Sequence, residues 1–126
     1  PARMLFFDAM KQKRGQSDVA AADLAFARKA ASIACRSDWG GQGISCFYDA
    51  SYQDGGWGGP KNRAAALPSY KKACEMKPDR LDICFLYASA LIRYPAPLQD
   101  KPAGYAIMKD ICSKGHKSAC QTVKRQ

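Results

Sequence analysis

The sequence predicts an all-α fold built from about three repeated helix pairs. Six cysteines form three pairs that recur along the chain, with first members 38 or 39 residues apart and second members 36 or 38 apart. A repeat of this length indicates a helical solenoid or a propeller-type array. Apolar residues at three- to four-residue spacing, separated by glycine and proline clusters, favour helices. Residues 1–126 are therefore predicted to be one domain, with a half-repeat at 1–15 and repeats at about 16–54, 55–94 and 95–126.

Two helices are predicted at the start of the chain, one in the half-repeat and one in the first repeat. Residues 2–14 hold a short apolar run followed by basic residues, and we expect a helix there that ends at Gly15. Ser17 or Asp18 can cap the next helix, which holds Cys35 in its last turn. Apolar residues keep helical spacing along this helix: Val19, Ala22, Phe26, Ala30 and Ile33.

Glycine-rich loops separate the next two helices. The glycines at 40–43 precede a helix that contains Cys46. The loop at 54–60, with four glycines and a proline, precedes a helix over roughly 62–77. Pro68 falls inside this range, so either the helix begins at Pro68 or it is kinked there.

The C-terminal half repeats the pattern. A helix over 80–93 is expected to end before the proline-rich turn at 94–97. Asp100 can cap the following helix, which extends to Gly115. A short last helix contains Cys120.

Each cysteine pair has one member near the end of a repeat's first helix and one near the start of its second. Two antiparallel helices joined by a short turn bring these positions together, although six cysteines formally allow many other connectivities. Such bonds would each stabilise the fold by about 2.5–3 kcal/mol on the chain-entropy model. The even count indicates an oxidising compartment. The predicted disulfides are Cys35–Cys46, Cys74–Cys84 and Cys112–Cys120.

The net charge and the hydropathy of the chain limit its possible partners and its location. The net charge of +9 implies nucleic acid, anionic lipid or an acidic protein as partner. The basic residues are scattered in short runs without a nucleic-acid-binding motif, so an acidic protein is favoured over nucleic acid. No stretch approaches the roughly 20 apolar residues of a membrane span. Because the chain opens at Pro1, we expect that a signal peptide has been removed and that the protein is periplasmic or secreted.

The sequence predicts no catalytic residues, metal site or cofactor. His116 is the single histidine. Ser118 and Asp110 lie nearby, but no nucleophile elbow supports a catalytic triad. The glycine clusters lack phosphate-loop signatures. The protein is thus predicted not to be an enzyme. Aromatic and basic residues are candidates for partner contact because such residues dominate binding hot spots: Trp39, Trp57, Tyr52, Lys71 and Lys72.

Three segments match one repeat motif: the glycines around Trp57, ALPSYKKAC at 66–74 and GHKSAC at 115–120. Through them, residues from about 16 to 123 resemble the Sel-one-like repeats, relatives of the tetratricopeptide repeat, and in particular their cysteine-rich exported members. The resemblance implies a short right-handed α/α solenoid with one disulfide per helix pair, in which Trp57 can fill a hydrophobic loop position. Pro68 and the turn at 76–81, which lacks the usual glycine, depart from the family pattern.

Helical solenoids usually bind other proteins. The resemblance implies, most concretely, an exported immunity protein that neutralises an antibacterial effector, such as a lipase delivered by type VI secretion. The alternative is a general scaffold or assembly factor of the periplasm or the mitochondrial intermembrane space. Binding or hydrolysis of β-lactams or cell-wall fragments is less favoured, because the chain lacks the serine–lysine motif of penicillin-recognising enzymes.

Overall fold

The computed structural model describes residues 18–37 and 43–126, and these residues form six α-helices and no strand. The predicted all-α fold is confirmed for this part of the chain, whereas the predicted helix at 2–14 lies outside it. None of the described helices is both long and apolar enough to cross a membrane. The helices are α2 (Asp18–Arg36), α3 (Ile44–Gly55), α4 (Arg63–Met76), α5 (Leu81–Arg93), α6 (Lys101–Ser113) and α7 (Lys117–Lys124).

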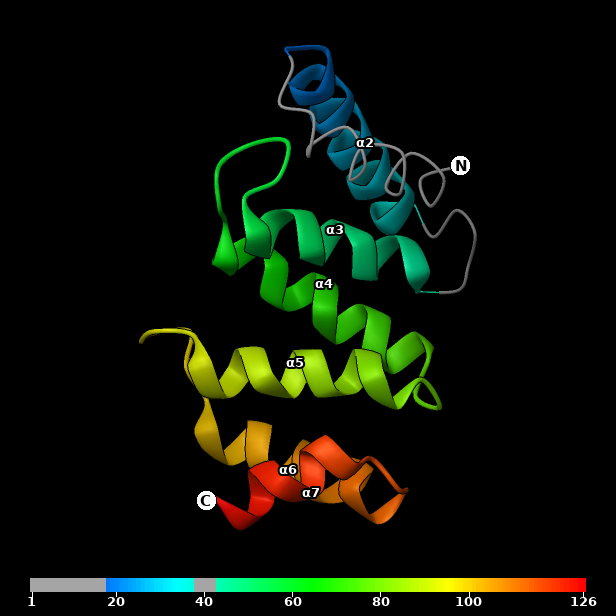
Figure 1. The fold of residues 1–126 in the computed structure, drawn as a ribbon. Coiled ribbons are helices and arrows are strands. Elements are labelled where there is room, and N and C mark those ends of the chain that lie inside the picture. Colours follow the sequence, from blue (N-terminus) through cyan, green and yellow to red (C-terminus); the bar gives the residue numbers. More distant parts are fainter. Residues whose placement is uncertain (1–17, 38–42) are drawn as a thin grey trace.

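The helices pack in the order in which they occur along the chain. The extensive helix–helix contacts all join successive helices, from α2 on α3 to α6 on α7. The described molecule is therefore elongated, with α2 at one end and α6 and α7 at the other (Figure 1). Because the helices at the two ends do not pack on each other, each junction between neighbours must be stable by itself.

Three disulfides close alternate junctions of this stack. Cys35–Cys46 joins the end of α2 to the start of α3, with a Cα–Cα distance of 4.5 Å. Cys74–Cys84 joins α4 to α5 and Cys112–Cys120 joins α6 to α7, each with a Cα–Cα distance of 4.8 Å. These distances lie within the range of unstrained disulfides. The pairing is the one predicted from the repeat.

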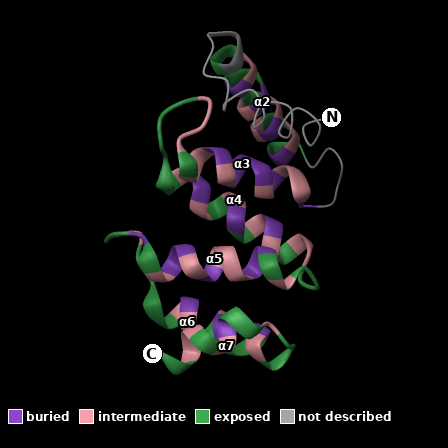
Figure 2. Ribbon diagram, viewed as in Figure 1, coloured by how far each residue is buried: buried purple, intermediate pink, exposed green. Residues whose placement is uncertain are grey.

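The buried face of α2 differs from the apolar stripe that predicted the helix. Ala27 and Ala31 are fully buried against α3, whereas Phe26 is 62% exposed and Ile33 is 49% exposed. Figure 2 shows buried and exposed positions interleaved along this helix. Small alanine side chains let α3 approach closely, and Tyr52 of α3 fills the space beside them. Phe26 and Ile33 consequently lie on the exposed side of α2, whereas Leu24 is buried with the alanines.

The loop between α3 and α4 lies against α2. Gly58 in this loop has a φ of +73°, and a Cβ atom there would lie 2.3 Å from the carbonyl oxygen of Leu24. The Arg28 guanidinium of α2 donates a hydrogen bond of 3.4 Å to the carbonyl oxygen of Trp57. The glycines that predicted a loop are therefore also needed for close backbone packing on α2.

Pro68 lies within α4, which settles the alternatives left by the sequence. The helix begins at Arg63, and the Asn62 side chain caps it by accepting a hydrogen bond of 3.0 Å from the backbone N–H of Ala65. The prediction that the helix begins at Pro68 is therefore wrong. Pro68 has no backbone N–H, so the carbonyl oxygen of Ala64 loses its hydrogen-bond partner within the helix. Both residues are exposed, so water can hydrate this oxygen.

We expect Gly58→Ala to lower the free energy of unfolding by at least about 3 kcal/mol, because it combines a left-handed φ with a backbone clash. Gly115→Ala is the matched control: its φ is +103°, but a Cβ atom there meets nothing within 4 Å. This control substitution should lower the free energy of unfolding by about 1–2 kcal/mol, from backbone strain alone. Urea denaturation followed by circular dichroism measures both, and equal losses would contradict the packing of the loop on α2.

Candidate functional site

Tyr52 and Trp57, two of the predicted aromatic contact residues, do not share an exposed surface. Trp39 lies outside the described residues. Tyr52 is fully buried, and Trp57 is half-buried and packs against the same core between α2 and α3. The backbone N–H of Trp57 donates a hydrogen bond of 3.0 Å to the carbonyl oxygen of Tyr52. A partner would reach Tyr52 only after local rearrangement, and partner binding by these residues stays a prediction.

The predicted basic contact residues are adjacent on α4 but differ in role. Lys71 is exposed. Lys72 is half-buried, and its Nζ atom donates a hydrogen bond of 2.8 Å to the carbonyl oxygen of Cys35. That carbonyl lies at the C-terminal end of α2, where a positive charge is favourable. Lys72 thus links α4 to the end of α2, and Lys71 is the member of the pair that faces solvent.

A carboxylate cluster centred on Asp54 joins three helices. The Tyr94 hydroxyl of α5 donates a hydrogen bond of 2.7 Å to Asp54 Oδ1, and the Tyr70 hydroxyl of α4 donates one of 3.2 Å to Asp54 Oδ2. Arg63 Nε lies 3.9 Å from Asp54 Oδ1. The Arg63 guanidinium also lies over the Tyr94 ring, 5.4 Å from its centroid. Asp54 therefore connects the last turn of α3 to α4 and α5.

Both tyrosines of this cluster are held in the protonated form. Burial, together with the negative charge of Asp54 and the hydrogen bond to it, raises the pKa of Tyr70 to about 12. Burial also raises the pKa of Tyr94, helped by the hydrogen bond to Asp54. Both phenols consequently remain hydrogen-bond donors at neutral pH, and neither is a ready base.

A second carboxylate, Asp49, is buried on α3 and is 5% exposed. Its Oδ2 atom accepts a hydrogen bond of 2.7 Å from the Ser69 hydroxyl of α4, and its Oδ1 atom accepts one of 3.4 Å from Gln53 Nε2. Gln53 Oε1 in turn accepts from the Arg28 guanidinium of α2. Asp49 thus lies in a polar chain from α2 to α4. Since its oxygens have internal donors, this carboxylate acts in the packing of the helices.

His116 has a structural partner for its ring nitrogen. Its Nδ1 atom accepts a hydrogen bond of 3.1 Å from the backbone N–H of Ala119 and so caps α7. The ring stacks on Phe85, with centroids 4.7 Å apart and planes at 23°. His116 lies in the turn that joins α6 to α7. Its imidazole links that turn to α5.

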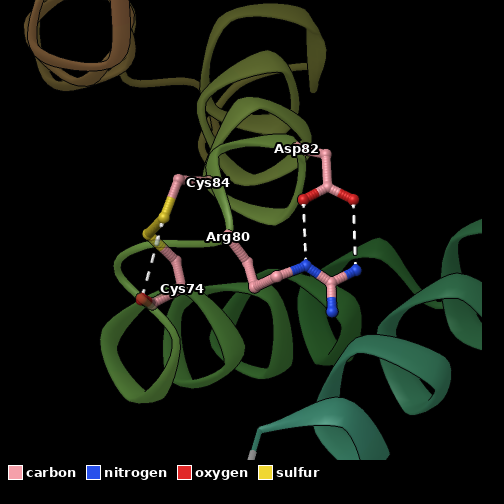
Figure 3. Close-up of polar contacts among 4 residues, drawn as sticks. All are labelled: Cys74, Arg80, Asp82 and Cys84. Carbon is pink, nitrogen blue, oxygen red and sulfur yellow. Dashed lines mark hydrogen bonds and ion pairs between the residues drawn. A yellow bond between two sulfur atoms is a disulfide. The ribbon is translucent and has the colours of Figure 1, made fainter. Parts of the chain in front are cut away.

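The turn between α4 and α5 is fixed without the glycine that the repeat motif uses. Arg80 donates two hydrogen bonds of 3.4 Å to the Asp82 carboxylate, beside the Cys74–Cys84 disulfide (Figure 3). The Arg80 guanidinium lowers the pKa of Asp82 by hydrogen bonding to it. Asp82 lies in the first turn of α5, where a negative charge is favourable.

Comparison with protein-family models and with curated protein sequences gave no match to this chain. Within the described ranges, no three His, Cys, Asp or Glu side chains are grouped closely enough to hold a metal ion. The resemblance to Sel-one-like repeats therefore stays a prediction from the sequence motif.

Sequence reasoning missed the roles of Asp49 and Asp54. The sequence predicted no contact for either residue, whereas both accept hydrogen bonds from side chains of other helices. The sequence offered one signal, since Tyr70 lies on a predicted helix, Tyr94 directly follows another, and a buried tyrosine hydroxyl needs a partner.

We expect Tyr94→Phe to lower the free energy of unfolding by about 1.5–3 kcal/mol, because it removes a short hydrogen bond to a carboxylate. Tyr70→Phe removes a longer bond and should cost less. Tyr105→Phe is the control, because the Tyr105 hydroxyl has no hydrogen bond to the described residues, and it should change stability by less than about 0.5 kcal/mol. Equal losses of unfolding free energy for all three variants in urea denaturation would contradict the hydrogen bonds to Asp54.

Alkaline pH should destabilise the protein through its buried tyrosines. Burial raises the pKa of Tyr52 and of Tyr70 to about 12. A group whose folded pKa is raised stabilises the fold fully below its unfolded pKa of about 10 and loses that contribution as pH rises toward 12. Absorbance at 295 nm should show these tyrosines ionising together with loss of helical circular dichroism. Ionisation of all tyrosines near pH 10 with the helices intact would contradict their burial.

Proposed function

We propose that this protein is a non-enzymatic, exported protein-interaction module whose helix pairs form a short right-handed solenoid of Sel-one-like repeats. Its partner is a protein with an acidic surface. Three observations support the proposal: the repeated helix pairs, the disulfide in each pair and the positive surface charge. The disulfides are typical of proteins that function in an oxidising compartment.

The distribution of charge is the observation on which the proposal depends most. Exposed lysine or arginine side chains occur on every described helix except α3. They are Lys29, Arg36, Arg63, Lys71, Arg93, Lys101, Lys109, Lys117 and Lys124. An elongated molecule that carries such charges along its length is suited to bind an extended acidic surface, and the charges would speed association.

Several acidic residues are engaged within the fold. Asp49 and Asp54 accept hydrogen bonds from neighbouring helices. Asp82 and Asp110 form ion pairs with Arg80 and Lys114. The acids therefore neutralise little of the remaining basic surface, which favours an acidic protein as partner.

The most concrete form of this function is an immunity protein that binds and inhibits an antibacterial secreted effector. Such a protein needs a rigid surface, and the three disulfides and the buried carboxylates supply rigidity. A general scaffold of the periplasm is the alternative. The two differ in the number of partners and in the effect of binding on the partner's activity.

Affinity capture from the lysate of the source organism tests this proposal. The bait is the disulfide-bonded protein, and the control bait is an unrelated disulfide-bonded protein of similar size and net charge. We expect one partner that forms a stoichiometric complex with the bait and not with the control. If that partner is an effector, its enzymatic activity should fall to background at equimolar protein.

Enrichment of many proteins in equal amounts on the bait alone would favour the scaffold. Recovery of the same proteins on both baits would contradict specific protein binding, because charge alone would explain the capture.

A further inference from the structure

An apolar groove runs between α5 and the two C-terminal helices. It has a volume of about 350 Å³. One face of α5 forms its long wall, since the wall residues recur at helical spacing. The groove is lined by Phe85, Leu86, Ser89, Ile92 and Arg93 of α5, Met108 of α6 and Thr122 of α7.

Rigid contacts on both sides hold this groove open. A Cβ atom at Gly104 would lie 2.6 Å from Ile92 Cγ1 and 2.9 Å from the carbonyl oxygen of Ala88, so glycine lets α6 approach α5 closely. The Cys112–Cys120 disulfide fixes α7 to α6. At the other end, the His116 ring stacks on Phe85. The groove walls are thus set by helices and a covalent bond, which lowers the entropic cost of filling the groove.

The groove contains apolar surface that the fold leaves incompletely buried. Met108 is 1% exposed and forms the floor, whereas Phe85, Leu86 and Ile92 are only half-buried. Covering these three side chains would remove further apolar area from water, which is favourable at roughly 25 cal/mol per Å². The groove can therefore bind an apolar group.

Arg93 makes the groove favour a ligand with a negative charge. It is exposed in the last turn of α5, and no acidic side chain in the described part of the chain forms an ion pair with it. Arg80 and Lys114, in contrast, both have carboxylate partners. A guanidinium binds a carboxylate with two parallel hydrogen bonds, so an acidic group next to the apolar one would fit this site.

We propose that the groove receives one large apolar side chain of an acidic partner protein, with a neighbouring carboxylate of that partner bound by Arg93. The inference rests on the proposed protein-binding function and assigns a surface to it. A volume of about 350 Å³ matches the space of about a dozen water molecules at roughly 30 Å³ each, so it has room for a single apolar side chain as large as that of tryptophan.

Selection from a display library of random peptides tests the groove without knowledge of the natural partner. The bait is the full disulfide-bonded chain. We expect selected peptides to share one large apolar residue with Asp or Glu within about two positions, the spacing that lets both groups reach one site. The best peptide is then synthesised with a fluorophore, and its dissociation constant is measured by anisotropy.

Two substitutions should each raise the dissociation constant of this peptide by at least about tenfold. Ser89→Trp fills the groove, and Arg93→Glu reverses the charge at its edge without touching the core. Lys61→Glu, in the loop before α4, changes the net charge equally, and Ser113→Trp places the same indole at an exposed position on α6. Both controls should change the dissociation constant by less than about threefold, as expected for residues outside an interface. Circular dichroism checks that each variant is folded.

Selected peptides without an acidic residue, or with affinity unchanged by Arg93→Glu and Ser89→Trp, would overturn the groove proposal. Failure to select any peptide would overturn it as well. A stoichiometric partner captured from the lysate would then still support protein binding through another surface. Conversely, peptides that bind this groove while the lysate yields no specific partner would support the groove and contradict the proposed function.

Discussion

The disulfide in each helix pair is the constraint on which the rest of the structure depends. Within the described residues the helices pack mainly on their neighbours in the chain, so a loosened junction has few contacts from distant segments to hold it. The junctions between α2 and α3, α4 and α5, and α6 and α7 each have a disulfide and the less extensive packing. The junctions between α3 and α4 and between α5 and α6 have no disulfide and pack more extensively. Junctions with a disulfide therefore alternate along the stack with junctions that have none.

Different kinds of interaction stabilise the two junctions that lack a disulfide. Between α3 and α4, Asp49 and Asp54 accept hydrogen bonds from side chains of the next helix, and Asp54 extends the contact to α5 through Tyr94. Between α5 and α6, Gly104 permits close approach and apolar residues fill the interface. Polar contacts fix the position of one helix on another, whereas apolar packing supplies most of the stability. The apolar groove lies beside this apolar junction, and Thr122 of the short helix α7 also lines it.

Local patterns predicted the helices and the disulfides, because helical spacing, glycine and proline positions and repeated cysteines act over short distances. Contacts between distant segments could not be predicted in this way. The burial of Ala27 in place of Phe26 depends on which face α3 approaches. The role of Asp54 depends on tyrosines that lie 16 and 40 residues further along the chain. Trp57 was a candidate contact residue because it lies in a loop, but that loop packs on α2.

The central claim is that each helix pair is a covalently closed unit of one repeating stack. Mass spectrometry of a non-reduced tryptic digest tests it most directly. Cleavage after Arg36, Arg80 and Lys114 separates the members of each pair, so every disulfide yields two linked peptides. The account predicts linked peptides for Cys35–Cys46, Cys74–Cys84 and Cys112–Cys120 alone. A peptide that links cysteines of two different pairs, or six free thiols in protein from its native compartment, would contradict it.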